Sequence, residues 1–253
     1  NMTTERMIGT SFGQTFVRIV GSDNAPPLVL IPGDEETSLA WTFVVESLSR
    51  PYRVYALDRI NDIGRSIPLS DHAHSIQTPQ DYVVWLHEIV TKISPSGRPV
   101  HVVAHSYGAW QASLHAMAHP EQVERLVLLA PSATVLPPRL GVLLRAILYG
   151  SLPSTFQPVL KWYTKRYMYW FAPASVQKEP SRVIMDEMIQ ENLLARRCYK
   201  KRTFVPPTTF TDDEWAKLSV ANPTLFMVGD KEVMYSPIKA IRRVERVAPS
   251  VKS

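Results

Sequence analysis

The stretch VVAHSYGAW, Val102 to Trp110, decides the fold because it joins an apolar run to a helical one through a single serine. The valines before the turn predict a buried strand, and the small-residue run after it predicts a helix that continues to Ala118. Ser106 lies between them, with Ala104 two residues before it and Gly108 two residues after it. Small residues at both places permit a turn tight enough to lift the serine hydroxyl out of the sheet edge.

The position of Ser106 also suits nucleophilic chemistry. A serine hydroxyl is a weak nucleophile, so it needs a base to take its proton and dipoles to stabilise the oxyanion that forms. At the start of a helix, unpaired N–H groups and the positive end of the helix dipole favour such a negative charge. The backbone N–H of Tyr107 is the predicted oxyanion donor on this side. The alternative interpretation is an ordinary serine that begins a helix after a strand.

Short apolar runs alternate with helical patterns on both sides of this turn. One helix is predicted from Tyr82 to Ile93 by apolar residues at helical spacing, with Thr78 as its N-cap and Pro79 in its first position. Strands are predicted at residues 14–20, 28–31, 53–57, 100–103, 123–129 and 224–228. Strands that alternate with helices indicate an α/β fold with a mostly parallel, doubly wound sheet.

The pattern changes between residues 134 and 210, where no strand is predicted. We expect this segment to be an all-helical cap inserted after the sixth strand, with residues 1–133 and 211–253 forming the core. The segment carries twelve basic and four acidic residues, a net charge of +8 in a chain of net charge +5. We interpret this charge as a solvated helical surface, because no nucleic-acid-binding motif accompanies it.

Composition argues against several other classes of protein, among them membrane-spanning, secreted and disulfide-bonded proteins. No apolar run approaches the roughly 18 residues that a membrane-spanning helix needs, and the N-terminus has no apolar signal core. The chain has one cysteine, Cys198, which excludes an internal disulfide. We therefore expect a cytoplasmic protein without a transmembrane segment. No metal-ligand spacing surrounds the cysteine, and we expect neither a metal nor a cofactor.

Several segments, taken in chain order, resemble the α/β-hydrolase family over nearly the whole chain. VVAHSYGAW is similar to its nucleophile elbow, and LVLIPGDEETSLAW to its oxyanion-loop segment. This resemblance implies that the backbone N–H of Asp34 is the second oxyanion donor. PTLFMVGDKEVMYSP is similar to the strand and loop that carry the catalytic acid. By motif register the resemblance favours Glu232 as the acid, with Asp230 as the alternative.

The histidine base is the feature that the sequence does not supply. The family order is serine, acid, histidine, yet none of the 21 residues after Glu232 is histidine. His105 adjoins Ser106 on the turn and points the wrong way to take its proton. We expect that the sequence stops before the catalytic histidine; the alternatives are a degenerate member without the base, or recruitment of His72 or His74 from the loop SDHAHSIQ. These two histidines have no evident third metal ligand.

The function implied is hydrolysis of carboxylic esters through an acyl-enzyme at Ser106, with the histidine base absent from this chain. The expected partner is a small-molecule ester with an apolar acyl group, and two copies are expected to pair through an exposed sheet edge. The alternative is a non-catalytic binding protein of the same fold. Asp34, Glu35 and Glu36 follow the oxyanion-loop glycine, and we expect them to oppose catalysis unless they point to solvent.

Overall fold

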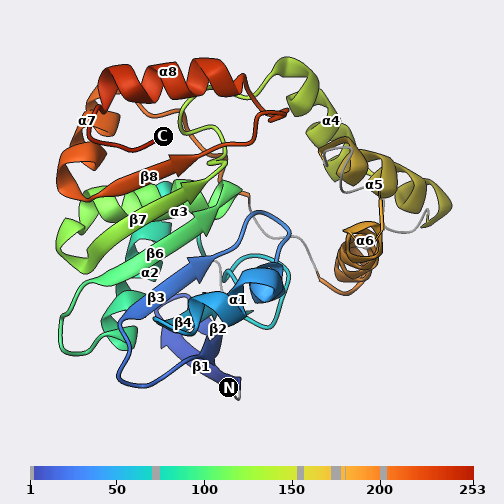
Figure 1. Cartoon of the computed structure of the whole chain (residues 1–253). Helices are drawn as coiled ribbons and strands as arrows, with labels where there is room; N and C mark the ends of the chain where they lie inside the picture. Colours follow the sequence, from blue (N-terminus) through green and yellow to red (C-terminus); the bar gives the residue numbers. More distant parts are fainter. Residues whose placement is uncertain (1–2, 70–74, 153–156, 172–177, 180, 200–203) are drawn as a thin grey trace.

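The computed structural model describes residues 3–69, 75–152, 157–171, 178–179, 181–199 and 204–253. Its centre is one eight-stranded sheet in the spatial order β1-β2-β4-β3-β6-β7-β8, with the short β5 paired to β2. The strands are β1 (Thr4–Thr10), β2 (Gly13–Val20), β3 (Pro27–Ile31), β4 (Arg53–Leu57), β5 (Ile67–Pro68), β6 (Val100–His105), β7 (Val123–Leu129) and β8 (Thr224–Met227). Figure 1 shows the sheet with the helices around it.

Neighbouring strands are parallel along the stretch β4-β3-β6-β7-β8 of the sheet. Strand β2 is antiparallel to β1, β4 and β5. The prediction of a mostly parallel α/β sheet is therefore confirmed. Strand β1 was not predicted, because four of its seven residues, TERM, are exposed and give no apolar signal. At the other edge, Lys252 forms a parallel bridge to Leu225 of β8.

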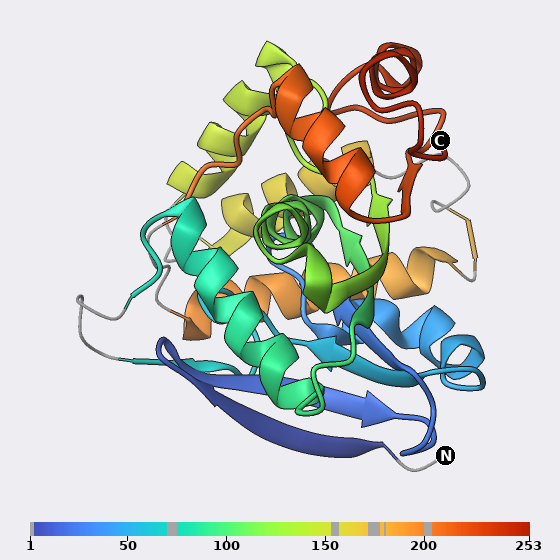
Figure 2. The same cartoon turned by 90° about the vertical axis from the view of Figure 1, so that its left-hand side faces the viewer.

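Apolar cores lie on both faces of the sheet, because β3 is apolar along its length. Leu28 and Leu30 pack with Trp41 on one face, and Val29 and Ile31 join the larger core on the other. Helix α1 (Thr42–Leu48) covers the first face, whereas α2 (Pro79–Ile93) and α3 (Ser106–Ala118) lie on the opposite side of the sheet (Figure 2). Helices α7 (Asp212–Ala221) and α8 (Pro237–Val247) also contribute to the larger core.

Local signals account for the helix ends. Thr78 accepts a hydrogen bond from the Asp81 amide, and the Asp81 carboxylate accepts one from the Thr78 amide, so α2 begins with a capping box and Pro79 in its first turn. Thr211 and Glu214 form the same arrangement at α7. Short 3-10 turns, η1 (Ser38–Trp41) and η2 (Pro120–Gln122), precede α1 and follow α3.

Three helices follow β7 and extend away from the sheet (Figure 1). They are α4 (Leu140–Ser151), α5 (Gln157–Phe171) and α6 (Ser181–Cys198). Leu160, Ile189 and Leu193 form a small separate core between α5 and α6. We call α4, α5 and α6 together the helical arm.

One glycine fixes the approach of α3 to β3. A Cβ atom at Gly108 would lie 2.3 Å from the carbonyl oxygen of Pro32 and 2.8 Å from that of Ile31. Contacts this short are repulsive and both partners are backbone atoms, so neither can move without shifting the strand or the helix. The first turn of α3 is therefore held against the end of β3, and only glycine fits there.

We predict that Gly108→Ala lowers the free energy of unfolding by about 1–3 kcal/mol, the usual cost of overpacking a close-packed site. Urea unfolding followed by circular dichroism measures this change. Gly141→Ala in α4 is the matched control, because no atom lies within 4 Å of the added methyl group there. Equal stabilities of the two variants would contradict the close approach.

Candidate active site

Ser106 has an unusual backbone conformation at the junction of β6 and α3. Its φ angle is +49°, in the left-handed region that residues with a Cβ rarely occupy. Ser106 is the first residue of α3 and is half-buried, and its carbonyl oxygen accepts a hydrogen bond from the Ser132 amide at 3.0 Å. Strained backbone of this kind persists only where surrounding contacts hold it. Here the Gly108–Pro32 contact and the Ser132 bond hold it.

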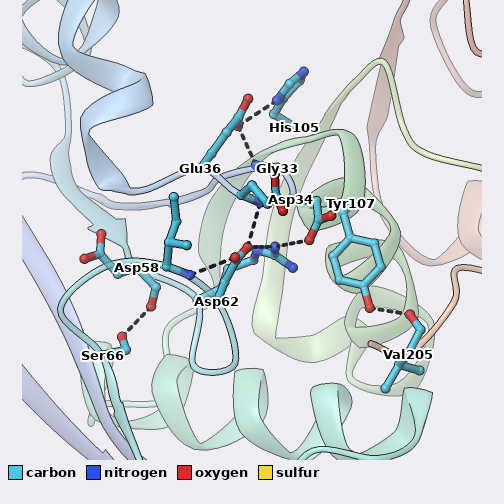
Figure 3. Close-up of polar contacts among 12 residues, drawn as sticks. Gly33, Asp34, Glu36, Asp58, Asp62, Ser66, His105, Tyr107 and Val205 are labelled. Atoms are coloured by element: carbon cyan, nitrogen blue, oxygen red, sulfur yellow. Dashed lines mark hydrogen bonds and ion pairs between the residues drawn. The ribbon is translucent and has the colours of Figure 1, made fainter. Parts of the chain in front are cut away.

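Two backbone amides are the candidate oxyanion donors. Tyr107 is the second residue of α3, so its N–H is among those that a helix leaves without an intrahelical partner. Asp34 lies in the loop after β3, and the close contact of Gly108 with Pro32 brings this loop against the first turn of α3. We call residues 33–37 the oxyanion loop. The Tyr107 side chain is buried and donates from its hydroxyl to the Val205 carbonyl (Figure 3).

Each carboxylate of the oxyanion loop has a partner. Asp34 is half-exposed and pairs with Arg59 at 3.1 Å. Glu35 accepts a hydrogen bond from Asn192 at 3.0 Å. Glu36 accepts one from the Gly33 amide at 2.6 Å. We expected these carboxylates to oppose catalysis unless they pointed to solvent; instead, each of the three is bonded to a donor, namely Arg59, Asn192 or the Gly33 amide.

A buried ion pair anchors the oxyanion loop to the segment that follows β4. The side chain of Arg59 is 2% exposed and pairs with Asp62 as well as Asp34, and its guanidinium lies 4.6 Å from the centre of the Tyr107 ring. Burial works to lower the pKa of Arg59, but the carboxylates of Asp62 and Asp34 outweigh it and the pKa is raised. Asp62 also accepts a hydrogen bond from the Glu35 amide at 2.9 Å. Arg59 and Asp62 follow the end of β4, so this ion pair links the segment after β4 to the oxyanion loop (Figure 3).

His105 also binds the oxyanion loop. Its Nδ1 lies 3.0 Å from a carboxylate oxygen of Glu36. Figure 3 marks this contact between the two side chains. Burial lowers the pKa of His105, but the negative charge of Glu36 outweighs it and the net pKa is raised, with a further contribution from Glu232. For Glu36, burial raises the pKa, and His105 and the Gly33 amide reverse this, so the net pKa is lowered. The ring of His105 thus pairs with a loop carboxylate beside Ser106.

The two candidate acids lie in different environments. Asp230 is exposed in the turn after β8. Glu232 is half-buried, its amide donates to the Gly229 carbonyl at 3.1 Å, and its carboxylate accepts from the Met234 amide at 2.8 Å. The charge of Glu232 raises the pKa of His105, so this carboxylate is within electrostatic reach of the turn that carries Ser106. That environment favours Glu232 for an acid that must act on groups near the serine.

The histidines predicted as substitutes, His72 and His74, lie outside the described residues. Among the described histidines, His87 and His119 stack with ring centres 4.3 Å apart, and His115 lies beside His119. His115 is buried, and burial lowers its pKa to about 3. His101 is at the start of β6, at the opposite end of the strand from Ser106. Within the described part of the chain, no group of three or more His, Cys, Asp or Glu residues could hold a metal ion.

Sequence reasoning missed three supporting residues: Arg59, Glu36 as the partner of His105, and Asn192. Arg59 carried no clear signal, because an arginine is rarely buried unless it is paired, and the strand pattern does not identify its partners. Asn192 carried none, since its partner Glu35 is 157 residues away in the sequence.

Two open grooves lie on the helical arm and contain no residue of the Ser106 site. One, of about 380 Å³, is lined by Glu179, Arg182, Val183, Asp186, Glu187 and Gln190. The other, of about 570 Å³, is lined by Pro158, Lys161, Gln190, Leu193, Leu194 and Arg197. Of the helices that the structure describes, none has the length and apolar character to cross a bilayer.

Known proteins resemble this chain over most of its length. The chain is 28% identical over 247 residues to an uncharacterised carboxylesterase, nap, of Bacillus subtilis strain 168, covering 97% of this chain and 76% of the relative. It is 25% identical to carboxylesterase YbfK of the same organism, covering 97% and 77% of the two chains. The crystal structure of naproxen esterase from Bacillus subtilis superposes with a TM-score of 0.82 at 25% identity, over 99% of this chain and 82% of that one.

A family model described as "Alpha/beta hydrolase family" matches residues 28–249, which include β3, the oxyanion loop, the turn at Ser106 and the loop at Glu232. The match therefore spans most of the sheet and all of the site described above. The chain belongs to the alpha/beta hydrolase family.

Proposed function

We propose that this protein is a carboxylic ester hydrolase that forms an acyl-enzyme at Ser106. The observation that carries the proposal is the left-handed backbone of Ser106, φ +49°, at the start of α3. A strained strand-to-helix turn of this kind holds a serine nucleophile with its hydroxyl exposed above the sheet. The similarity to Bacillus subtilis carboxylesterases over 97% of the chain supports the same reaction class.

In the proposed reaction, the Ser106 Oγ attacks the ester carbonyl carbon and loses its proton to a base. The carbonyl π electrons move to oxygen, and the amides of Asp34 and Tyr107 donate to the oxyanion. When the carbonyl re-forms, the alcohol leaves with a proton and the acyl group remains on Ser106. Water then attacks the acyl carbon, giving the carboxylic acid and free serine. Among the described histidines none is placed to take this proton, so we assign the transfer to none of them.

The buried Arg59 serves this chemistry by compensating the charge of Asp34. A carboxylate beside the oxyanion site would repel the negative charge of the transition state. Arg59 pairs with the Asp34 carboxylate at 3.1 Å and so offsets its charge. The backbone amide of Asp34 is the group proposed to donate to the oxyanion. Glu232 is the proposed acid; its carboxylate would stabilise a cationic imidazole near Ser106.

The helical arm is proposed to act as the cap of the enzyme, within the boundaries 134–210 expected from the sequence. Its helices contact the oxyanion loop through Asn192 and through the Glu191 carboxylate, which accepts from Thr37 at 3.3 Å. We propose a small-molecule ester with an apolar acyl group as the substrate.

A second candidate function rests on the missing base. Of the described histidines, only His105 adjoins Ser106, and its ring pairs with Glu36. A protein with an intact pocket and no base would bind an ester or acid without turnover. Activity that depends on Ser106 distinguishes the two candidates.

We predict that this chain hydrolyses p-nitrophenyl butyrate slowly, yet faster than Ser106→Ala, which cannot form the acyl-enzyme. An oxyanion hole and binding alone retain about 10³–10⁴-fold over water when the triad is incomplete. After subtraction of the hydrolysis that imidazole causes without protein, added imidazole should raise the rate of the unsubstituted chain and of Ser96→Ala but not that of Ser106→Ala. Ser96→Ala, at an exposed loop serine, is the control. If Ser106→Ala and the unsubstituted chain give equal rates, with and without imidazole, the protein is a binding protein.

We also predict that Glu232→Gln lowers the imidazole-dependent rate about tenfold, because the carboxylate that stabilises the imidazolium is neutralised. Asp230→Asn removes the same charge two residues away at an exposed site and should change the rate less than twofold. The measurement is the slope of rate against imidazole concentration at fixed pH. A larger loss in Asp230→Asn than in Glu232→Gln would assign the acid to Asp230 instead.

A further inference from the structure

Two consecutive residues of the helical arm bind the oxyanion loop. Asn192 of α6 is 5% exposed, and its side-chain amide donates to the Glu35 carboxylate at 3.0 Å. The preceding residue, Glu191, accepts from the Thr37 hydroxyl at 3.3 Å. These bonds join residues more than 150 positions apart in the chain. A buried amide bonded to a carboxylate is a strong and directional link.

The side chain of Asn192 is itself held in place by α4. Its carbonyl oxygen accepts a hydrogen bond from the hydroxyl of Tyr149, which is also buried. Arg196, one helical turn after Asn192, donates to the backbone carbonyls of Tyr149 and Leu152 at 3.1 and 3.2 Å and lies 4.3 Å from the Tyr149 ring centre. Because both ends of the Asn192 amide are bonded, its rotamer is fixed and its N–H points at Glu35.

Glu35 has a backbone conformation that needs such support. Its φ angle is +55°, again in the left-handed region, and the residue is not glycine. On the core side, its amide donates to Asp62, which pairs with the buried Arg59. On the side of the helical arm, its carboxylate binds Asn192. A non-glycine residue in this conformation costs free energy and persists where its surroundings impose it.

Helix α5 contributes Tyr167, whose ring lies near this link. Burial raises the pKa of the Tyr167 hydroxyl to about 12, and the carboxylates of Glu35 and Asp34 add to the shift. Tyr167 stacks on Tyr149, with ring centres 4.7 Å apart. Helix α6 therefore contacts the oxyanion loop directly, Tyr149 of α4 bonds Asn192, and Tyr167 of α5 packs on Tyr149.

We propose that Asn192 is a positioning residue that holds Glu35 in its left-handed conformation and thereby aims the Asp34 amide at the oxyanion. The oxyanion hole is then complete only while α6 is docked on the loop. This inference rests on the proposed function for the role of the Asp34 amide, although the loop-holding part of it does not. Docking of the helical arm would in this way couple substrate enclosure to transition-state stabilisation.

The first test is hydrogen exchange of the amides of residues 33–37, which does not depend on activity. Asn192→Ala should speed their exchange about tenfold, the size expected for losing a hydrogen bond to a charged acceptor. Gln190→Ala removes an exposed amide from the same helix and is the matched control. Peptides from β7 should exchange at the same rate in all variants, which separates a local effect from general loss of stability. Unchanged exchange of residues 33–37 in a folded Asn192→Ala variant would overturn the proposal.

The second test measures the oxyanion hole with phenylboronic acid. The Ser106 Oγ forms a bond to boron, the serine proton goes to buffer, and boron becomes a four-coordinate anion that resembles the tetrahedral intermediate. We expect Asn192→Ala to weaken this binding about tenfold, because a misplaced oxyanion donor loses part of a contribution of about 10²–10³ in rate. With p-nitrophenyl butyrate, kcat should fall by the same factor while KM changes less than twofold.

Two further variants separate a positioning role from a structural one. Glu35→Gln keeps a side-chain oxygen for Asn192, so boronate binding should stay within about threefold of the unsubstituted chain. Glu35→Ala should match Asn192→Ala, and the double variant should lose no more than either single one, since both remove the same link. Additive losses would overturn the proposal. If Ser106→Ala and the unsubstituted chain bind the boronate equally, the proposed function fails, and the exchange test alone decides the role of Asn192.

Discussion

The contact between Gly108 and the Pro32 carbonyl is the constraint on which the site depends. It lets the first turn of α3 approach the end of β3 so closely that a methyl group at position 108 would lie 2.3 Å from a backbone oxygen. The same approach forces Ser106 into a left-handed conformation and brings the oxyanion loop beside the start of the helix. Two apolar cores pack on the two faces of β3, and such close packing resists movement of the strand away from this contact.

The acidic side chains near this contact are each paired with a donor. The loop after β3 carries three consecutive acidic residues, and each binds a donor from another element: Arg59 after β4, the helical arm, or His105 of the elbow. A buried arginine is expensive to desolvate, and pairing with two carboxylates offsets that cost. The result is a loop whose side chains hold it to the rest of the protein, and two of whose backbone amides, those of Gly33 and Glu35, are themselves bonded to carboxylates.

Much of the fold could be predicted because its signals are local. Ala104 and Gly108 indicate the tight turn, and the apolar runs indicate the parallel strands. Thr78 and Asp81 indicate the start of α2. Strand β1 could not be predicted, because an exposed edge strand needs no apolar pattern. The links of Glu35 to Asn192 and of Glu36 to His105 could not be predicted either. They join distant residues, and nothing in the local sequence of a carboxylate indicates which donor it will meet.

The central claim is that the Ser106 hydroxyl is the nucleophile. The most direct measurement is peptide mapping by mass spectrometry after brief exposure of the chain to p-nitrophenyl acetate. Because no described histidine is placed as the base, hydrolysis of the acyl-enzyme should be slow, and the account predicts one acetyl group per chain, located on the peptide that contains Ser106. Acetyl groups spread over surface lysines, with none on that peptide, would contradict it.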